Sequence, residues 1–327
     1  MLTKITSNFS VAGLVTIGVL LGCTNSVHAE SVKLRIGYGA AAEEQLWLLI
    51  AKPDLGKNYG KLYTIEGAQF RSSDQRAQAF EAGAIDLASS SANSVIFAAA
   101  EGIEVKIIAS LTRESTRGFS TSFYVPANSP IKSIKDLKGK TVAINGFATS
   151  GDLWLRVALE KNGLLPTDAN VVPISFPAMA ESLRSGKIDV GEFPQPFAAL
   201  LEKQMPVTKL FSAKDAIPYD EELIVLVAKD AFLKKNAAAI SAMLEDLKAA
   251  TAFYLGNPVE ARQALIDTKM VRVPADVFLH MPDYYREPSL MVDVSALKKM
   301  QEGQIQAGFQ KKRTDIDALV DLNYLPK

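Results

Sequence analysis

The chain has 327 residues, 48% of them hydrophobic, so it is long enough for about two domains with apolar cores. Its 36 basic and 36 acidic residues balance, which argues against the basic face that a nucleic-acid-binding protein needs. Cys23 is the only cysteine, and His28 and His280 are the only histidines. Disulfides and cysteine-ligated metals are therefore excluded, and we expect no metal site and no nucleic-acid partner.

The N-terminus has the pattern of an export signal. Residues 11–21 are an apolar run, too short to cross a bilayer as a helix, after a segment with one charge, Lys4. Two processing sites compete. The segment LLGC at 20–23 resembles a lipobox, which would make Cys23 a lipidated N-terminus, whereas VHA at 27–29 fits a small-residue cleavage site. We expect a signal peptide over 1–29 and a periplasmic or extracytoplasmic protein, with anchoring through Cys23 left open.

After residue 31, segments typical of strands alternate with segments typical of helices. The expected strands of the first half are 33–38, 61–66, 85–88, 105–111 and 120–125. The expected helices are 44–51, 74–82 and 93–101, and Gly83 and Gly102 end the last two. This order predicts an α/β fold of mostly parallel sheets flanked by helices.

The second half continues the alternation and then becomes mainly helical. A short helix over 130–138 precedes the expected strands 141–145, 171–176, 188–192 and 222–228. Helices are expected over 151–162, 179–185, 197–204, 231–255, 259–268, 274–280, 294–307 and 316–321. A weak internal repeat, FEAGAID at 80–86 and LRSGKID at 183–189, combines a helix end, a glycine and a strand start. It favours two similar lobes.

One segment is more informative than the others. Residues 129–145, SPIKSIKDLKGKTVAIN, predict a short helix, a left-handed glycine at Gly139 and a buried strand. This segment resembles periplasmic solute-binding proteins of ABC importers, in particular the nitrate/sulfonate/taurine (NMT1/THI5-like) branch. Asn257-Pro258 in the helical tail and the ending DALVDLNYL at 317–325 also look like features of this family.

The resemblance implies a two-lobed periplasmic-binding-protein fold of type II with a two-strand hinge. Lobe one would be 31–125 plus 224–327, and lobe two would be 126–223. It further implies that the protein is a monomer, that it is not an enzyme and that it needs no cofactor. Such a protein captures a small anion or an organic sulfonate or carboxylate between its lobes and delivers it to a membrane permease.

Ligands of open α/β sheets bind beyond the carboxyl ends of strands, where free backbone N–H groups attract anions. Four such turns supply most of our candidate ligand-binding residues. These candidates are Tyr38, Gly39, Ser73, Asp74, Gln75, Ser90, Ser91, Asn93, Thr149, Ser150 and Gly151. The turn at 146–152 is the best anion cradle, because it combines small residues, two hydroxyls and a helix start.

Glu192 and Gln195 are further candidates. The family usually has an aromatic and an acidic residue before the proline that corresponds to Pro196, and here Pro194 and Gln195 replace them. A neutral Gln195 could hydrogen-bond an anion without repelling it. This departure puts the usual ligand in doubt.

Arginine binds carboxylates and sulfonates with two parallel hydrogen bonds. Arg71, Arg76, Arg113 and Arg117 follow predicted strands of lobe one, and Arg113 is the preferred candidate because it closes the strand 105–111.

Two alternatives stay open. The segment GYGAAA at 37–42 fits the dinucleotide fingerprint, with Glu66 at the end of the next strand, which would indicate an exported NAD-dependent oxidoreductase. A binding protein for a pyrimidine, such as a thiamine precursor, or for an aromatic acid is also compatible with this fold.

Overall fold

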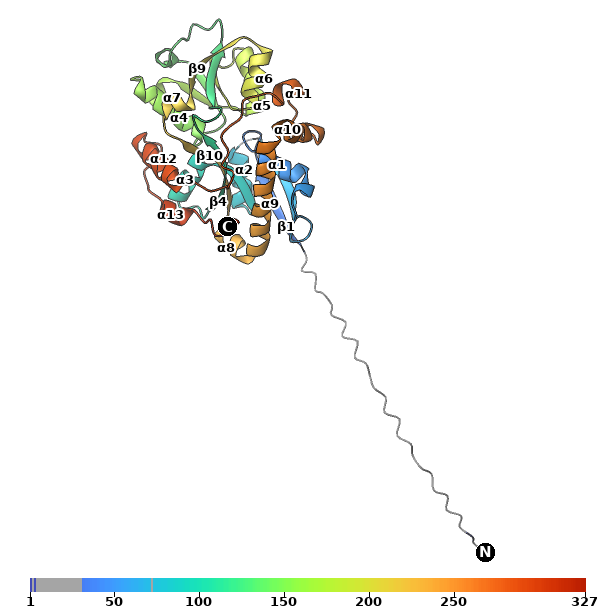
Figure 1. Cartoon of the computed structure of the whole chain (residues 1–327). Helices are drawn as coiled ribbons and strands as arrows, with labels where there is room; N and C mark the ends of the chain where they lie inside the picture. Colours follow the sequence, from blue (N-terminus) through green and yellow to red (C-terminus); the bar gives the residue numbers. More distant parts are fainter. Residues whose placement is uncertain (2, 4–30, 72) are drawn as a thin grey trace. The chain divides into compact units, whose positions relative to one another are not determined.

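The computed structural model describes residues 1, 3, 31–71 and 73–327 (Figure 1). The expected signal peptide, both processing sites and Cys23 lie outside the described residues. Ser31–Lys327 forms one compact unit. None of the described helices combines the length and the apolar composition needed to span a bilayer.

The first sheet contains strands from both halves of the chain in the order β2-β1-β3-β10-β4. Its strands are β1 (Val32–Tyr38), β2 (Tyr63–Gln69), β3 (Leu87–Ser91), β4 (Lys106–Glu114) and β10 (Glu221–Ala228). Pairing is parallel for β1 with β2 and β3, whereas β10 runs antiparallel between β3 and β4. The sheet is therefore mostly parallel, as the alternation of elements predicts.

Two helical layers cover this sheet, because the side chains of its strands point alternately to opposite faces. On β10, Leu226 packs with one apolar cluster and Val225 and Val227 pack with another. The first cluster includes α1 (Glu44–Ala51), α9 (Ala237–Gly256) and α10 (Pro258–Asp267). The second includes α2 (Ser73–Glu81), α3 (Ala92–Ala100), α12 (Val294–Gln306) and α13 (Ile316–Leu319). We call this sheet with its helices lobe one.

The second sheet has the order β7-β6-β8-β5-β9. Its strands are β5 (Ser122–Pro126), β6 (Thr141–Ile144), β7 (Asn170–Pro173), β8 (Val190–Phe193) and β9 (Val207–Ser212). One face packs on α4 (Ser150–Lys161) and α7 (Ala213–Ala216), and the other packs on α5 (Phe176–Arg184) and α6 (Phe197–Gln204). Here too one strand, β5, runs against the others. We call this sheet with its helices lobe two.

Two connections join the lobes. Since β4 belongs to the first sheet and β5 to the second, the chain first crosses within 115–121. It crosses back within 217–220, between α7 and β10. We therefore propose lobe boundaries in these connections, slightly before the expected boundaries at 125/126 and 223/224.

Several local expectations were wrong. The expected helix over 130–138 is only a 3₁₀ turn, Ile134–Leu137, because Asp136 Oδ2 accepts the backbone N–H groups of Lys132 and Ser133, both at 2.9 Å. Gly139 has a φ of 73° and is the left-handed residue that we expected. The expected helix over 231–255 is divided at Asn236 into α8 (Asp230–Lys235) and α9. Strand β9 and helix α7 were not expected.

The remaining described elements are short. They are the 3₁₀ helices Pro53–Leu55 and Pro166–Asp168 and the helix α11 (Ala275–Phe278).

Candidate functional site

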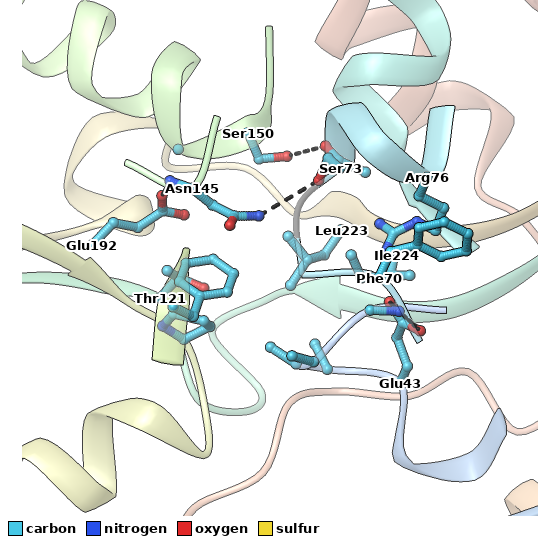
Figure 2. Close-up of a pocket in the computed structure, with 18 of the residues that line it drawn as sticks. Glu43, Phe70, Ser73, Arg76, Thr121, Asn145, Ser150, Glu192, Leu223 and Ile224 are labelled. Atoms are coloured by element: carbon cyan, nitrogen blue, oxygen red, sulfur yellow. Dashed lines mark hydrogen bonds between the residues drawn. The ribbon is translucent and has the colours of Figure 1, made fainter. Parts of the chain in front are cut away.

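A cavity of about 70 Å³ lies between the two lobes, and we call it the inner chamber (Figure 2). Lobe one lines it with Gly39, Ala40, Ala41, Ala42, Glu43, Phe70, Arg71, Ser73, Arg76, Ser91, Leu223 and Ile224. Lobe two and the first connection line it with Thr121, Asn145, Ser150, Gly151, Trp154, Phe176, Glu192 and Pro194. Glu43 and Arg76 lie on one side of the chamber, and Asn145 and Glu192 lie on the other (Figure 2).

The wall formed by lobe one contains a buried pair of opposite charges. Glu43 Oε2 accepts the backbone N–H of Gly39 at 2.9 Å, in the loop that follows β1. Burial raises the pKa of Glu43, and the nearby charge of Arg76 opposes this shift. The carboxylate of Glu43 thus occupies the loop that the dinucleotide alternative would need for a pyrophosphate.

Arg76 is the most unusual residue of this wall. Its side chain comes from α2 and is only 5% exposed, yet it makes no hydrogen bond and no ion pair with any described residue. Burial lowers the pKa of its guanidinium. A guanidinium has five N–H donors, and leaving them unpaired in a buried site is costly. The side chain is therefore available for an acidic group in the chamber.

The wall formed by lobe two contains a second buried carboxylate. Glu192 at the end of β8 is 4% exposed, and its Oε2 accepts the backbone N–H of Asn145 at 3.1 Å. Burial raises the pKa of Glu192 to about 7, which the bond from Asn145 only partly opposes. A Cβ atom at Gly151 would lie 2.2 Å from Glu192 Oε2. Only glycine leaves room there for the carboxylate against the first turn of α4.

This arrangement changes the interpretation of the turn at 146–152. We expected it to present open N–H groups to an anion, but the Glu192 carboxylate packs against this helix start. In addition, Asp152 Oδ2 accepts the N–H of Ala148 at 3.0 Å, and Thr149 Oγ1 donates to the carbonyl of Gly146 at 2.7 Å. The protein's own groups therefore occupy much of the expected cradle.

The lobes contact each other across the chamber. The hydroxyl oxygens of Ser91 and Ser150 are 2.8 Å apart, and Asn93 Nδ2 donates to Ser150 Oγ at 3.0 Å. Asn145 Nδ2 donates to Ser73 Oγ at 3.5 Å (Figure 2). These hydrogen bonds link the two lobes directly, so the structure is a closed form.

Besides the arginines, six of the sequence candidates line the inner chamber: Gly39, Ser73, Ser91, Ser150, Gly151 and Glu192. Asn93 lies just behind the wall, where it contacts Ser150. Gln75 lies exposed on α2, and the side chain of Asp74 lies outside the described part.

Four other candidates do not line the chamber. Tyr38 Oη lies 3.9 Å from Met270 Sδ, and Ser90 is paired with Val225 in the first sheet. Thr149 caps its own turn, and Gln195 Oε1 accepts the N–H of Ala199 at 3.2 Å.

Arg113, the preferred arginine, also lies outside the chamber. Its Nε donates to Glu222 Oε1 at 2.9 Å, and its Nη2 donates to the carbonyl of Met291 at 2.6 Å. Both contacts fix β4 to neighbouring segments. Arg117 pairs with Asp220, so only Arg71 and Arg76 of the four arginine candidates reach the chamber.

Sequence reasoning missed Glu43 and Asn145. Asn145 directly follows β6, and this position at a strand end was a usable signal. Trp154 belongs to the apolar core of lobe two and also lines the chamber, and its Nε1 donates to Glu221 Oε2 at 2.8 Å. Glu43 carried no recognisable pattern.

Two further buried carboxylates lie at the connections between the lobes. Glu114 Oε1 accepts the N–H of Thr121 at 3.0 Å, and its Oε2 has no hydrogen-bond partner in the described part of the chain. Oε1 of Glu221 is likewise without a partner there. Burial raises the pKa of Glu114, and it raises the pKa of Glu221 to about 7. Within the described residues, no cluster of three or more His, Cys, Asp or Glu side chains could hold a metal ion.

A larger cavity of about 700 Å³ adjoins the inner chamber, and we call it the outer chamber. Both chambers share Ala40, Phe70, Arg71 and Phe176. The outer chamber is further lined by Trp47, Gln69, Pro177, Ala180, Glu181, Arg184, Pro196, Phe197, Leu200, Gln204, Met205, Lys269, Met270, Val271, Arg272 and Val273.

One protein family has a sequence profile that matches more than half of this chain. Residues 68–261 match the sequence profile of the family described as NMT1/THI5 like. The chain is 28% identical over 293 residues to a putative aliphatic sulfonates-binding protein of Escherichia coli (strain K12), which covers 88% of this chain and 87% of that protein.

Solved structures show the same fold. The alkanesulfonate-binding protein SsuA of Xanthomonas axonopodis pv. citri, bound to MOPS, matches 90% of this chain and 99% of that chain with a TM-score of 0.73 at 19% identity. The periplasmic nitrate-binding protein NrtA of Synechocystis PCC 6803 matches 90% of this chain and 87% of that chain, with a TM-score of 0.72 at 15% identity. The likeness shows that this chain has the fold of the periplasmic binding proteins.

Proposed function

Because this chain belongs to the NMT1/THI5-like family, we propose that it is the extracytoplasmic substrate-binding component of an ABC importer. It would capture a small organic sulfonate or carboxylate between its lobes and deliver it to a membrane permease. Similar proteins include binding proteins named for sulfonates and for nitrate, which supports this class of ligand, and one named for riboflavin.

The observation that carries the proposal is the buried guanidinium of Arg76, which makes no hydrogen bond with a described residue and lines a chamber between two lobes. An acidic group bound there would satisfy N–H donors that no described residue satisfies. A hydrogen bond between charged groups contributes about 1.5–3 kcal/mol, so Arg76 would supply a large part of the affinity. Ser73, Ser91 and Ser150 would add hydroxyl contacts from both lobes.

The buried carboxylates favour binding over dinucleotide chemistry. Glu43 accepts the backbone N–H of Gly39 and so fills the loop after β1, where the dinucleotide fingerprint would need a pyrophosphate. The pyrimidine alternative has no comparable observation in its favour.

Calorimetry on the protein, stripped of carried-over ligand by unfolding and refolding, tests the proposal. The compounds are methanesulfonate, taurine, nitrate, acetate, benzoate and NAD. We expect a sulfonate or carboxylate to bind, and Arg76→Gln to weaken that binding about tenfold to a hundredfold through the lost charged hydrogen bonds.

Arg313→Gln is the matched control. Arg313 is exposed and pairs with Glu302, and neither residue lines the inner chamber. Its affinity should equal that of the unchanged protein. If Arg76→Gln binds as tightly as the control, or if NAD alone binds, the proposed function is wrong.

A further inference from the structure

The two chambers differ in size in a way that bears on the ligand. The inner chamber, at about 70 Å³, has room for a group of only a few atoms, since one water needs roughly 10–15 Å³ by the same measure. The outer chamber, at about 700 Å³, lies within the range of roughly 300–1,000 Å³ that is usual for organic ligands. Phe70, Arg71 and Phe176 line both, so a ligand held in one can extend into the other.

Apolar side chains form one part of the walls of the outer chamber. Phe176 and Phe197 begin α5 and α6 in lobe two, and their ring centroids are 5.8 Å apart at an interplanar angle of 28°. Trp47 and Met270 face the chamber from lobe one. Both phenylalanines and Met270 are only half-buried. Their remaining exposed surface is apolar area that a ligand would remove from water.

The charged residues of the outer chamber are mostly basic. Arg71, Lys269 and Arg272 are exposed and make no ion pair with any described residue, whereas Arg184 is paired with Glu181. This positive rim disfavours a cationic substituent and admits a neutral or anionic one.

We propose that the ligand is an organic acid with a bulky apolar substituent, whose acidic group lies in the inner chamber and whose substituent lies in the outer chamber. This inference rests on the proposed function, because Arg76 must first hold the acidic group. An acid of a few atoms would leave the apolar walls of the outer chamber uncovered. A substituent of several carbon atoms would contact Phe197 and Met270 from the two lobes at once.

The test compares three sulfonates that share one acidic group, by calorimetry on the refolded protein. Methanesulfonate has no substituent beyond a methyl group, octane-1-sulfonate has a flexible chain, and naphthalene-2-sulfonate has a planar ring system. We expect at least one of the two larger compounds to bind about tenfold tighter than methanesulfonate or more, which is the effect of burying about two CH₂ groups. Whichever of the two larger sulfonates gains more affinity shows whether the substituent is a chain or a ring.

Phe197→Ala is expected to remove most of this gain and to leave the affinity for methanesulfonate unchanged, since Phe197 does not line the inner chamber. Met270→Ala makes the same test from lobe one if Phe197→Ala does not fold. Phe253→Ala is the matched control, because Phe253 is also half-buried but lines neither chamber.

The outcomes separate the two proposals. Equal affinity for all three sulfonates would overturn the inference about the substituent and leave the proposed function standing. A gain that survives both Phe197→Ala and Met270→Ala would also overturn it, because the substituent would then lie elsewhere. Failure of every sulfonate and carboxylate to bind a correctly folded protein would overturn the proposed function, and the inference with it.

Discussion

Replacement of Glu221 by glutamine is expected to stabilise the protein at pH 8. The side chain is 1% exposed, and burial raises its pKa from the ordinary 4.5 to about 7, which the charge of Lys214 and the bond from Trp154 only partly oppose. A pKa shift of one unit corresponds to about 1.36 kcal/mol, so keeping this carboxylate ionised at pH 8 costs the folded state about 3 kcal/mol. Glutamine removes that charge, and its amide oxygen can still accept the hydrogen bond from Trp154 Nε1.

The pH dependence gives the sign of the effect. Between pH 4.5 and about 7 the folded state keeps a proton on Glu221 that the unfolded chain releases. The stabilising contribution of this proton is therefore complete below pH 4.5 and is lost as the pH rises through about 7. In Glu221→Gln this loss should be absent, so its advantage over the unchanged protein should be small at pH 4.5 and about 3 kcal/mol at pH 8.

Urea unfolding followed by circular dichroism at pH 4.5, 6 and 8 measures this difference. Glu104→Gln is the matched control, because Glu104 is exposed and the same change there should have little effect at any of these pH values. If the free energy of unfolding of Glu221→Gln is no higher than that of the control at pH 8, the buried carboxylate does not destabilise the folded state, and the reasoning is refuted.

Three further substitutions test the packing of the lobes. Gly151→Ala places a Cβ atom 2.2 Å from Glu192 Oε2. It should lower stability by about 1–3 kcal/mol and weaken ligand binding, as measured by thermal unfolding and calorimetry; unchanged binding would contradict the close packing. Arg286→Met leaves the buried Glu44 without its cation and should cost about 3–5 kcal/mol in urea unfolding, whereas a cost below 1 kcal/mol would contradict the buried ion pair. Asp246→Ala removes the acceptor of a buried tyrosine hydroxyl at 2.8 Å and should cost about 1–3 kcal/mol, and a neutral result in the same assay would show that this bond contributes little.

Most of the fold could be predicted because its strands and helices have a strong apolar pattern. The strand β9 could not, since its sequence, VTKLFS, has only two buried residues and lies at the edge of the second sheet. The sequence also could not predict that β10 runs antiparallel to its neighbours. Its partners β3 and β4 lie more than 100 residues earlier, and the apolar pattern of a buried strand is the same for either direction.

The site was harder to predict than the fold. Turns at strand ends indicated where the chamber lies, since strand order and the rule for open sheets determine this position. The sequence could not show which side chains turn inward. Arg113 is neutralised by Glu222, which lies 109 residues later and faces it only because β4 and β10 pair. Arg76 has the charge of Glu43 nearby but no hydrogen-bond partner among the described residues, and this difference exists only in the folded protein.

The positions of the acidic residues explain why recognition would depend on side chains here. In open α/β sheets, backbone N–H groups at loops and helix starts usually hold an anion. In this protein Glu43 accepts such a group in lobe one, and Glu192 accepts another in lobe two. An acidic ligand placed at either position would face a carboxylate of the protein. Arg76 lies on the opposite side of the chamber from Glu192, and its N–H groups bond no described residue, so a negative charge gains attraction there despite the nearby charge of Glu43.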